Sequence, residues 1–245
     1  HDRLSIIDLS ERGKQPMWDE RRELVIVFNG EIYNFNDLRK DLENKYNFRS
    51  VSDTEVILYA YREWGIECVK KLNGIFAFAI WDMRTQDLFI ARDRLGVKPL
   101  YYFYDDQKFI FSSEIKAILE HDIPREVNKE AFNLYFQLLY IPEPHTMFQG
   151  IKKLPSASYL KLDIAGKVEV IKYWQVTDFS DISSYEEAKN SIRNIFDDSV
   201  KRQLVSDRPV GVFLSGGMDS SAVLGAVSKF HEGKIKTFSV GFKDS

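Results

Sequence analysis

The chain has 245 residues, 44% of them hydrophobic and 29% charged, and a net charge of −3; these values are typical of a globular protein and offer no basic field for nucleic acid. Its longest apolar run, Ile75 to Trp81, is too short to cross a bilayer, and its first residues carry no secretory signal. One cysteine and four scattered histidines exclude an internal disulfide and a metal site rich in Cys or His, so we expect a cytoplasmic protein with no nucleic-acid or membrane partner and no certain metal ligand.

The first two thirds of the sequence predicts a mixed α+β domain. Dense apolar residues from 24 to 28 predict a strand that ends at Asn29-Gly30. Two helices are predicted next, at 37–46 and 54–64, and Gly65 is a natural stop for the second. Short β-rich runs between turn-forming residues then predict an antiparallel meander over 76–81, 88–91, 100–104 and 109–111. The remaining predicted elements are two short helices and one hairpin, at 114–120, 128–139, and 157–162 with 168–173.

The last quarter of the sequence changes to an α/β pattern. Ser184 and Glu187 form a capping box that opens a long helix. A strand at 210–214, a helix at 219–230 and a strand at 237–242 then predict one parallel βαβ unit of about thirty residues. Because one such unit cannot make a doubly wound sheet, only the first part of an α/β domain is predicted here.

The turn between this strand and helix reads Ser215-Gly-Gly-Met-Asp-Ser220. A strand that turns into a helix through two glycines leaves backbone N–H groups and the positive end of the helix dipole at one spot, where a phosphate can bind. The turn lacks the lysine of a Walker A motif, the Gly-x-Gly-x-x-Gly fingerprint and the leading glycine of a nucleophile elbow. It resembles the pyrophosphate loop of ATP pyrophosphatases, and the alternative is an ordinary strand-to-helix turn.

Four further stretches, taken with this loop, resemble the glutamine-hydrolysing asparagine synthetases in order and spacing over nearly the whole chain. They are Arg3-Leu-Ser-Ile-Ile-Asp8, Phe28-Asn-Gly-Glu-Ile-Tyr-Asn34, Ser52-Asp-Thr-Glu-Val-Ile57 and Ala91-Arg-Asp-Arg-Leu-Gly-Val-Lys-Pro-Leu-Tyr101. The resemblance implies an α+β class II glutamine amidotransferase domain of the N-terminal-nucleophile fold, with antiparallel sheets between helices, over residues 1–177. It implies the start of an ATP pyrophosphatase-type synthetase domain, an α/β fold like that of adenine nucleotide hydrolases, over residues 178–245.

The resemblance also implies an activity, the ATP-dependent amidation of aspartate to asparagine with ammonia from glutamine hydrolysis, through a β-aspartyl-AMP intermediate. Glutamine, ATP and aspartate are then the small-molecule partners, Mg²⁺ is expected with the pyrophosphate, and a homodimer is left open. Two alternatives also stay open. One is a related amidotransferase whose acceptor is a sugar, a peptide or a β-lactam precursor. The other is a non-catalytic module that binds glutamine or ATP.

The resemblance assigns roles in glutamine binding. In the family, the residues that match Asn29 and Gly30 form the oxyanion hole, the match of Arg3 binds the α-carboxylate and the match of Asp53 accepts the ammonium group. The full implied set is Arg3, Leu4, Ser5, Ile6, Ile7, Asn29, Gly30, Glu31 and Asp53. Each has an alternative: Asn29-Gly30 as a hairpin turn, Arg3 as a surface charge and Asp53 as a helix N-cap. The run 92–94 is expected to support the pocket, and its alternative is a solvated charge run.

The resemblance likewise implies an ATP site. Leu214 and Val240 would line the adenine pocket, although by themselves they predict core positions of strands. The residues implied to hold the pyrophosphate are Ser215, Gly216, Gly217, Asp219 and Ser220.

The family nucleophile, an N-terminal cysteine, has no match, because the sequence begins with His1 inside the family pattern. Cys68 lies in a predicted helical stretch away from Asn29-Gly30, so we expect it to be a buried apolar residue. The sequence also stops before most of the synthetase pattern. We therefore expect a fragment truncated at both ends, with neither activity alone. Its residues after about 205 are expected to be poorly ordered or prone to aggregate, since a lone βαβ unit leaves a strand edge uncovered.

Overall fold

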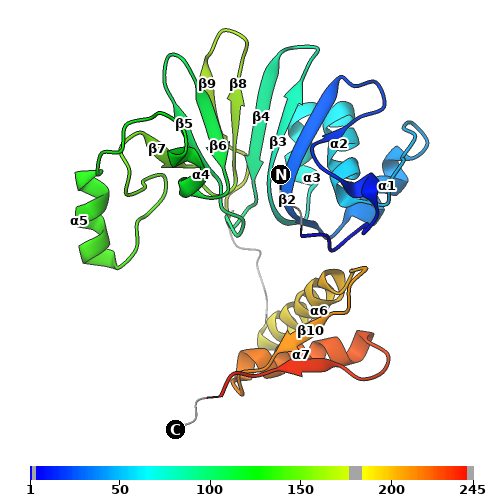
Figure 1. Cartoon of the computed structure of the whole chain (residues 1–245). Coiled ribbons are helices and arrows are strands. Elements are labelled where there is room, and N and C mark those ends of the chain that lie inside the picture. The colour runs from blue at the N-terminus through cyan, green and yellow to red at the C-terminus, as the bar shows by residue number, and fades with distance from the viewer. Residues whose placement is uncertain (2–3, 177–183, 242–245) are drawn as a thin grey trace. The chain divides into compact units, whose positions relative to one another are not determined.

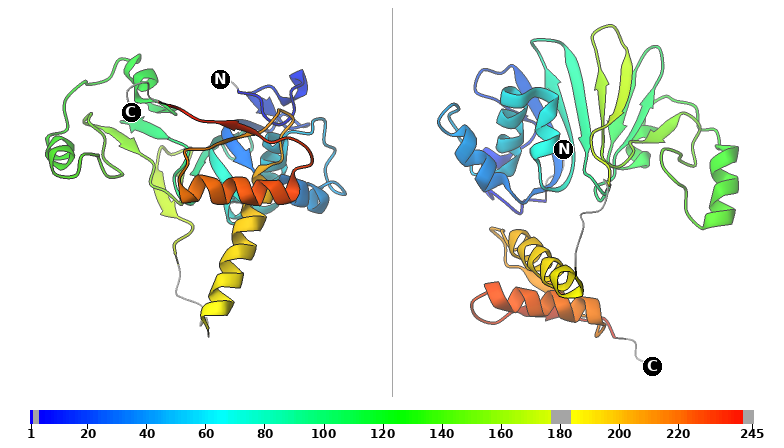
Figure 2. Two further views of the ribbon diagram at one scale, coloured as in Figure 1. Left: turned by 90° about the horizontal axis from the view of Figure 1, so that it is seen from below. Right: turned by 180° about the vertical axis from the view of Figure 1, so that it is seen from behind.

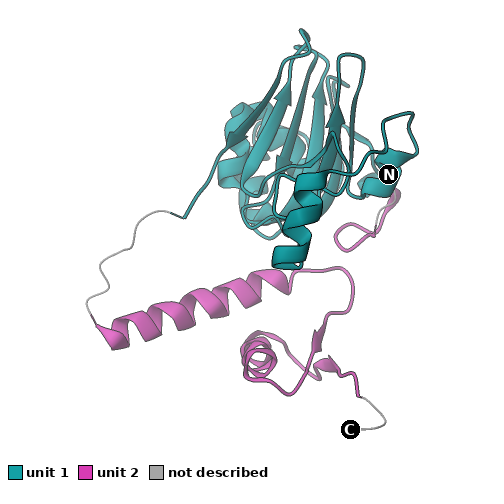
Figure 3. Cartoon of the chain, turned by 90° about the vertical axis from the view of Figure 1, so that its left-hand side faces the viewer, with its two compact units in different colours: residues 1–3, 12–176 teal, residues 4–11, 177–245 magenta. Residues whose placement is uncertain are grey.

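The computed structural model describes residues 1, 4–176 and 184–241 (Figure 1). Two compact units contain them: unit 1 comprises residues 1–3 and 12–176, and unit 2 comprises residues 4–11 and 177–245 (Figure 3). The segment 4–11 thus groups with the C-terminal residues, although unit 1 flanks it in the sequence. Within the described ranges, no helix combines the length and apolar character that a membrane span requires.

Unit 1 is built on a six-stranded antiparallel sheet in the order β1-β2-β3-β4-β8-β9. Its strands are β1 (Met17–Trp18), β2 (Leu24–Ile32), β3 (Gly74–Asp82), β4 (Asp87–Arg92), β8 (Ser158–Leu162) and β9 (Val168–Lys172). Side chains alternate between the faces of a strand. In β3, Phe76 and Phe78 therefore point to one face, while Ala77 and Ala79 point to the other.

A second antiparallel sheet packs on the alanine face of the first. Its three strands, in the order β6-β5-β7, are β5 (Tyr101–Tyr104), β6 (Phe109–Ser112) and β7 (Ile151–Lys153). Ala77, Ala79 and Ile90 of the large sheet share a buried cluster with Leu100 and Tyr102. The small alanine side chains allow the two sheets to approach closely.

Helices cover the outer faces of both sheets. On the large sheet they are α1 (Phe35–Leu42), α2 (Asp53–Trp64), η2 (Gly65–Glu67) and α3 (Cys68–Lys71), seen in blue to cyan in Figure 2. Tyr61 of α2 stacks on Phe89 of β4, with 5.3 Å between ring centroids. On the small sheet, Ile118 of α4 (Ile115–Leu119) packs against Phe103 and Ile151. Unit 1 is therefore an α/β/β/α sandwich, which confirms the predicted α+β class with antiparallel sheets between helices.

Two further elements lie outside these layers. The turn η1 (Glu11–Gly13) precedes β1, and α5 (Lys129–Leu138) stands apart from the sheets at the end of long connections (Figures 1 and 2). Asn128 caps α5 by accepting the backbone N–H groups of Glu130 and Ala131, both at 3.1 Å. The predicted helix at 128–139 is thereby confirmed.

The predicted meander is correct in its strands but wrong in its connectivity. β3 pairs with β4 and β5 pairs with β6, yet β4 and β5 belong to different sheets. The polar stretch between them, residues 93–100, carries the chain from one layer to the other. The hairpin of β8 and β9 is confirmed, and so is α2 with Gly65 as its C-cap. α1 is shorter than predicted, because it begins after Asn34 and ends at Leu42.

Unit 2 contains α6 (Tyr185–Gln203), β10 (Gly211–Phe213), α7 (Met218–Phe230) and β11 (Lys236–Phe238). β10 and β11 are parallel, which confirms the predicted βαβ unit; residue 242, its predicted end, lies outside the described residues. Ser184 caps α6 by accepting the Glu187 N–H at 3.2 Å, as the capping box predicts. Among the described residues this unit leaves large apolar side chains exposed, including Phe213 at 81% and Ile192 at 67%.

Candidate functional site

Asn29, Gly30 and Glu31 lie on β2, next to the central strand β3. In the antiparallel register, Asn29 faces Ala77, Gly30 faces Phe76 and Glu31 faces Ile75. The strand continues to Ile32, so the predicted strand end at Asn29-Gly30 is wrong. The hairpin-turn alternative for this dipeptide is wrong for the same reason, because both residues pair within the ladder.

Gly30 occupies a position where no side chain fits. Its φ is +152°, and a Cβ atom there would lie 2.1 Å from the Ile75 carbonyl oxygen and 2.8 Å from the Phe76 Cα. Real Cβ atoms do not approach backbone atoms this closely. Glycine is therefore required both for the backbone conformation and for the close contact with β3.

Asn29 makes a polar contact outside the sheet. Its Nδ2 donates to the Ser113 hydroxyl oxygen at 3.4 Å, between β6 and α4. One residue earlier, the Phe28 carbonyl oxygen lies 3.0 Å from a ring nitrogen of His1. The amide side chain of Asn29 is thus half-buried and held at one edge of the strand.

Asp53 reaches the same strand from α2. It is the first helical residue and only 3% exposed, and its Oδ2 accepts the Ile32 backbone N–H at 3.1 Å. The residue that caps the helix is Ser52, whose hydroxyl accepts the Thr54 N–H at 3.2 Å. The N-cap alternative for Asp53 is therefore wrong, and the carboxylate lies at the end of β2 instead.

Burial and charge act in opposite directions on the pKa of Glu31. Burial raises the pKa of Glu31 above its ordinary value, while the charge of Lys98 acts in the opposite direction. The neighbouring Tyr33 is half-buried, and its burial, with the negative charges of Glu31 and Asp93, raises the pKa of this phenol to about 12. A cationic ligand group would lower the cost of the ionised carboxylate.

Asp93 organises the turn that carries Lys98. Its carboxylate accepts the backbone N–H groups of Phe76 at 3.2 Å, of Val97 at 2.9 Å and of Lys98 at 3.0 Å. It also accepts the Leu95 N–H at 3.1 Å. Phe76 is the strand partner of Gly30, so this one buried side chain ties the turn to the strand behind the candidate site.

Arg92 holds the same turn through hydrogen bonds from its guanidinium group. Its guanidinium donates to the carbonyl oxygens of Lys98 at 2.7 Å and Leu154 at 2.6 Å, and to the Glu143 carboxylate at 2.9 Å. Arg92 and Asp93 are 2% and 1% exposed. The alternative of a solvated charge run is therefore wrong for these two residues, which form a buried polar network.

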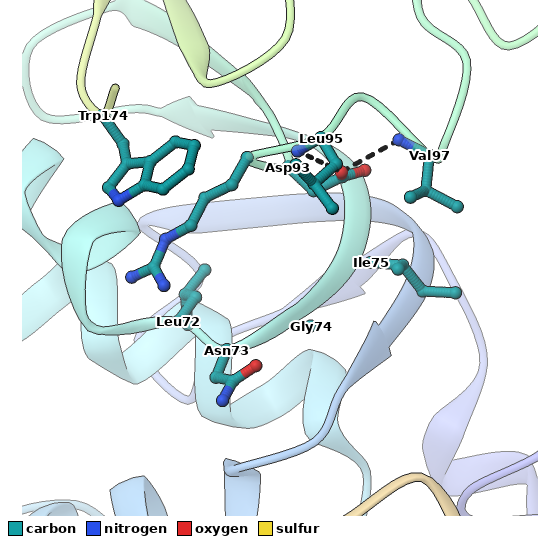
Figure 4. Close-up of a pocket in the computed structure, with 9 residues that line it drawn as sticks. Leu72, Asn73, Gly74, Ile75, Asp93, Leu95, Val97 and Trp174 are labelled. Atoms are coloured by element: carbon teal, nitrogen blue, oxygen red, sulfur yellow. Dashed lines mark hydrogen bonds between the residues drawn. The ribbon is translucent and has the colours of Figure 1, made fainter. Parts of the chain in front are cut away.

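A cavity of about 250 Å³ opens beside the start of β3 (Figure 4). Its lining residues are Leu72, Asn73, Gly74, Ile75, Asp93, Arg94, Leu95, Val97 and Trp174. None of Asn29, Gly30, Glu31 and Asp53 lines it, although Ile75 is the strand partner of Glu31. The motif residues from 93 to 97 thus border this cavity, which the sequence patterns did not predict.

The structure brings only part of the predicted glutamine set together. Asn29, Gly30 and Glu31 follow one another on β2, and Asp53 binds the backbone N–H of the next residue, Ile32. Arg3 lies outside the described residues, and Leu4, Ser5, Ile6 and Ile7 belong to unit 2.

The glycine loop of unit 2 turns β10 into α7 as predicted. Gly216 adopts a φ of +84°, and Gly217 is the N-cap residue of α7. The Ser220 hydroxyl accepts the Ser215 backbone N–H at 3.3 Å and donates to the Gly217 carbonyl oxygen at 3.2 Å. Ser220 therefore braces the loop from the first turn of the helix, which leaves the exposed glycines at its tip.

Leu214 lies close to the segment that leads to Val240. Its backbone N–H donates to the Phe238 carbonyl oxygen at 2.8 Å, and its carbonyl accepts the Ser239 hydroxyl at 2.6 Å. Val240 itself is 83% exposed, so the expectation that it is a core residue is wrong for the described part of unit 2. Asp219 is exposed in the first turn of α7.

Neither a metal cluster nor an accessible thiol is found in the described parts of the chain. Those residues contain no group of three or more His, Cys, Asp or Glu that could hold a metal ion. Cys68 of α3 is completely buried, and burial raises the pKa of its thiol. A buried thiol with a raised pKa is a poor nucleophile, in agreement with its predicted apolar role.

Comparison with protein families identifies unit 1. The family model described as "Glutamine amidotransferase domain" matches residues 1–174. The chain belongs to this family. A second model, described as "Asparagine synthase", matches residues 191–245.

Curated relatives extend the same resemblance. Asparagine synthetase [glutamine-hydrolyzing] 3 of Bacillus subtilis is 43% identical over 100% of this chain and 41% of its own length. Asparagine synthetase [glutamine-hydrolyzing] 1 of the same organism is 41% identical over 98% of this chain and 38% of its own length. The chain thus spans less than half the length of these relatives, and the predicted resemblance is confirmed.

A solved structure agrees with the fold. Glutamine phosphoribosylpyrophosphate amidotransferase from Bacillus subtilis aligns with a TM-score of 0.50 and 16% identity, over 98% of this chain and 50% of its own. At this identity the likeness supports the predicted fold of unit 1.

Proposed function

We propose that unit 1 binds glutamine, and that unit 2 binds ATP, for an ATP-dependent amidation of aspartate to asparagine. The observation that carries the proposal is the bond of Asp53 to Ile32, directly after Asn29, Gly30 and Glu31 on β2. The names of the curated relatives support the choice of reaction.

At the glutamine site, each group has a distinct task. The Asn29 amide and the Gly30 backbone N–H would stabilise the oxyanion that forms when the side-chain amide of glutamine is attacked. The Asp53 carboxylate would accept the ammonium group of the substrate, and Arg3 would bind its α-carboxylate as a planar fork. Gly30 suits its role because the absence of a side chain allows close approach to the backbone.

Hydrolysis also requires a thiolate, and Cys68, the one cysteine of the sequence, is fully buried. We therefore propose that the 245-residue chain by itself binds glutamine without hydrolysing it. An assay of ammonia release from glutamine by the purified chain tests this directly. Release above a buffer blank would contradict it.

At the nucleotide site, the aspartate side-chain carboxylate would attack the α-phosphorus of ATP, and pyrophosphate would leave. Ammonia would then attack the β-carbonyl of aspartyl-AMP and release AMP, giving asparagine. The pyrophosphate would lie against Ser215, Gly216, Gly217 and Ser220 at the start of α7, where the helix dipole favours an anion.

The oxygen donors of this loop suit Mg²⁺, which prefers carboxylate, phosphate and water ligands. The exposed carboxylate of Asp219 would hold the ion together with pyrophosphate oxygens. When bound, the ion neutralises charge on the departing pyrophosphate. A cytoplasmic location and a homodimer remain predictions.

Thermal unfolding of the chain with added ligands tests the proposed function. L-Glutamine at about 20 times its Kd should stabilise the native state by about 1.8 kcal/mol, which corresponds to a rise in Tm of about 4–7 °C. ATP with Mg²⁺ should raise the unfolding temperature of unit 2, and L-asparagine and GTP serve as controls. Equal shifts with the controls, or none with glutamine, would contradict the proposal.

A further inference from the structure

Arg94 lines the cavity beside β3 with part of its hydrogen-bonding capacity unused. Its Nη2 donates to the Lys70 carbonyl oxygen at 3.1 Å, in the last turn of α3. Its guanidinium carbon lies 5.8 Å from the centre of the Trp174 ring, which is within the range of a cation–π contact. Among the residues that the structure describes, the buried Nε of Arg94 finds no hydrogen-bond partner.

The unused donor of Arg94 suits a carboxylate. A buried N–H without an acceptor is costly, because the group has lost water and gained no bond in return. The Nε–H and one Nη2–H of a guanidinium lie side by side and match the two oxygens of a carboxylate. Nη2 carries two hydrogens, so its bond to Lys70 leaves one for a second acceptor. A carboxylate therefore satisfies this guanidinium better than a single oxygen does.

The rest of the cavity wall is mostly apolar (Figure 4). Its apolar side chains are those of Leu72, Ile75, Leu95, Val97 and Trp174. Leu95 and Val97 are 77% and 53% exposed, so apolar groups border the cavity where it meets solvent. The volume of about 250 Å³ has room for about eight groups of the size of water. The wall thus fits a small ligand with an apolar body.

The acidic side chain of the wall, Asp93, already has its hydrogen-bond partners. Its carboxylate accepts the four backbone N–H groups described above, which offset its charge. A second negative charge on the ligand would meet Asp93 or the apolar side chains, and neither would stabilise it. The wall therefore favours a ligand with one carboxylate over a ligand with two.

We propose that this cavity binds a small monocarboxylate, with its carboxylate on Arg94 and its apolar body against Leu72, Ile75 and Val97. Every residue of the site belongs to unit 1. None of the residues proposed to bind glutamine lines the cavity, so the inference does not rest on the proposed function.

Amide proton–nitrogen correlation spectra of the isotope-labelled chain test the site, with 4-methylpentanoate as the probe. Its neutral amide, 4-methylpentanamide, keeps the apolar body without the charge, and adipate adds a second carboxylate. Arg94→Met removes the guanidinium, and Arg94→Lys keeps a charge without the planar fork. Arg125→Met is the matched control, because the exposed Arg125 also donates from Nη2 to a carbonyl at the end of a short helix, that of Leu119 in α4.

The probe should shift the amides of Asn73, Ile75 and Val97 and saturate with a Kd of about 1 mM, as expected for a ligand of this size. The neutral amide and adipate should bind about tenfold more weakly or worse. Arg94→Met should raise the Kd of the probe by about tenfold, and Arg94→Lys by less. Arg125→Met should match wild type.

Each other result overturns a specific part of the proposal. The absence of a saturable shift at the cavity amides would overturn the site. Equal binding of the acid and its amide would overturn the role of the guanidinium, and this comparison needs only the wild-type chain, so it holds even if Arg94→Met does not fold. Equal binding of adipate would overturn the preference for one carboxylate. A loss in Arg125→Met as large as in Arg94→Met would overturn the assignment to Arg94.

Discussion

The Asp53 carboxylate accepts the Ile32 backbone N–H at 3.1 Å. This single bond joins the start of α2 to the end of the strand that carries Asn29, Gly30 and Glu31. The start of the helix and the end of the strand, which are separated by twenty residues in sequence, are therefore adjacent in the fold. The Asp53 carboxylate is almost fully buried, so water screens its interactions little.

Gly30→Ala should destabilise unit 1 far more than Gly65→Ala. Both glycines have positive φ, but a Cβ atom at Gly30 would overlap the Ile75 carbonyl oxygen, whereas nothing lies within 4 Å of one at Gly65. We expect a loss of about 3 kcal/mol or more at Gly30, and about 1–2 kcal/mol at Gly65 from backbone strain alone. Urea unfolding of the two variants measures the difference. Equal losses would show that crowding by β3 is not the cause.

Glu31→Gln should stabilise the chain at neutral pH and leave it unchanged in acid. Burial raises the pKa of Glu31, so the folded state binds this proton more tightly than the unfolded state. The stability from this group is therefore full below the unfolded pKa and is lost as the pH rises through the folded pKa. Glutamine at this position cannot ionise and avoids the loss.

Urea unfolding of wild type and Glu31→Gln at about pH 7 and about pH 4 tests this linkage. The variant should be the more stable protein at the higher pH, and the difference should shrink at the lower pH. A difference that does not depend on pH would mean that Glu31 is not the titrating group. Exposed Glu126→Gln is the matched control.

The sequence predicted the local features of the site better than its assembly. The end of helix α2 could be placed because Gly65 is a natural stop, whereas its N-cap, Ser52, was not predicted. The continuation of β2 through Asn29-Gly30 could not, since this dipeptide favours a turn and only its pairing with Phe76 and Ala77 holds it extended. That pairing is a long-range contact, which no local pattern reports.

The same limit applies to residues 4–11. These residues group with unit 2, where the Asp8 N–H donates to the carboxylate of Asp207, far away in the sequence and outside any motif. The change of sheet between β4 and β5 was missed because four short strands joined by turns, β3 to β6, would fit a single meander equally well. A supporting role for Arg92 and Asp93 was expected only through the family resemblance, and their burial was not predicted, since charged residues in a row usually face solvent.

Arg92→Met should destabilise unit 1 strongly. The variant keeps the approximate volume of the side chain but removes the donor of the Glu143 carboxylate and of three carbonyl oxygens, those of Gly96, Lys98 and Leu154. Breaking a buried pair in this way costs about 3–5 kcal/mol. Lys116→Met, at an exposed ion pair with Glu114, should change the stability little, because water screens such a pair. Similar unfolding midpoints for the two variants in urea would contradict the buried network.

Cys68 should not react with a thiol reagent while the chain is folded. The thiol is fully buried and burial raises its pKa, so little thiolate exists and the reagent cannot reach it. Labelling with a chromogenic disulfide should therefore be negligible in buffer and complete in concentrated urea. Rapid stoichiometric labelling without denaturant would return Cys68 to consideration as a nucleophile.

Asp53→Asn should raise the Kd for glutamine strongly and affect folding little. The asparagine oxygen can still accept the Ile32 N–H, so we expect a stability change of about 1 kcal/mol or less. If Asp53 binds the substrate ammonium group as proposed, loss of its charge should weaken glutamine binding by about tenfold or more. Asp41→Asn, at an exposed position of α1, is the matched control.

The most direct test of the glutamine site is a titration of the isotope-labelled chain with L-glutamine, followed by amide proton–nitrogen correlation spectra. The Gly30, Glu31 and Ile32 amides should shift and saturate in wild type and in Asp41→Asn, and should barely move in Asp53→Asn. The account would be contradicted if glutamine shifted no amide, or if it shifted only those that line the cavity between Leu72 and Trp174.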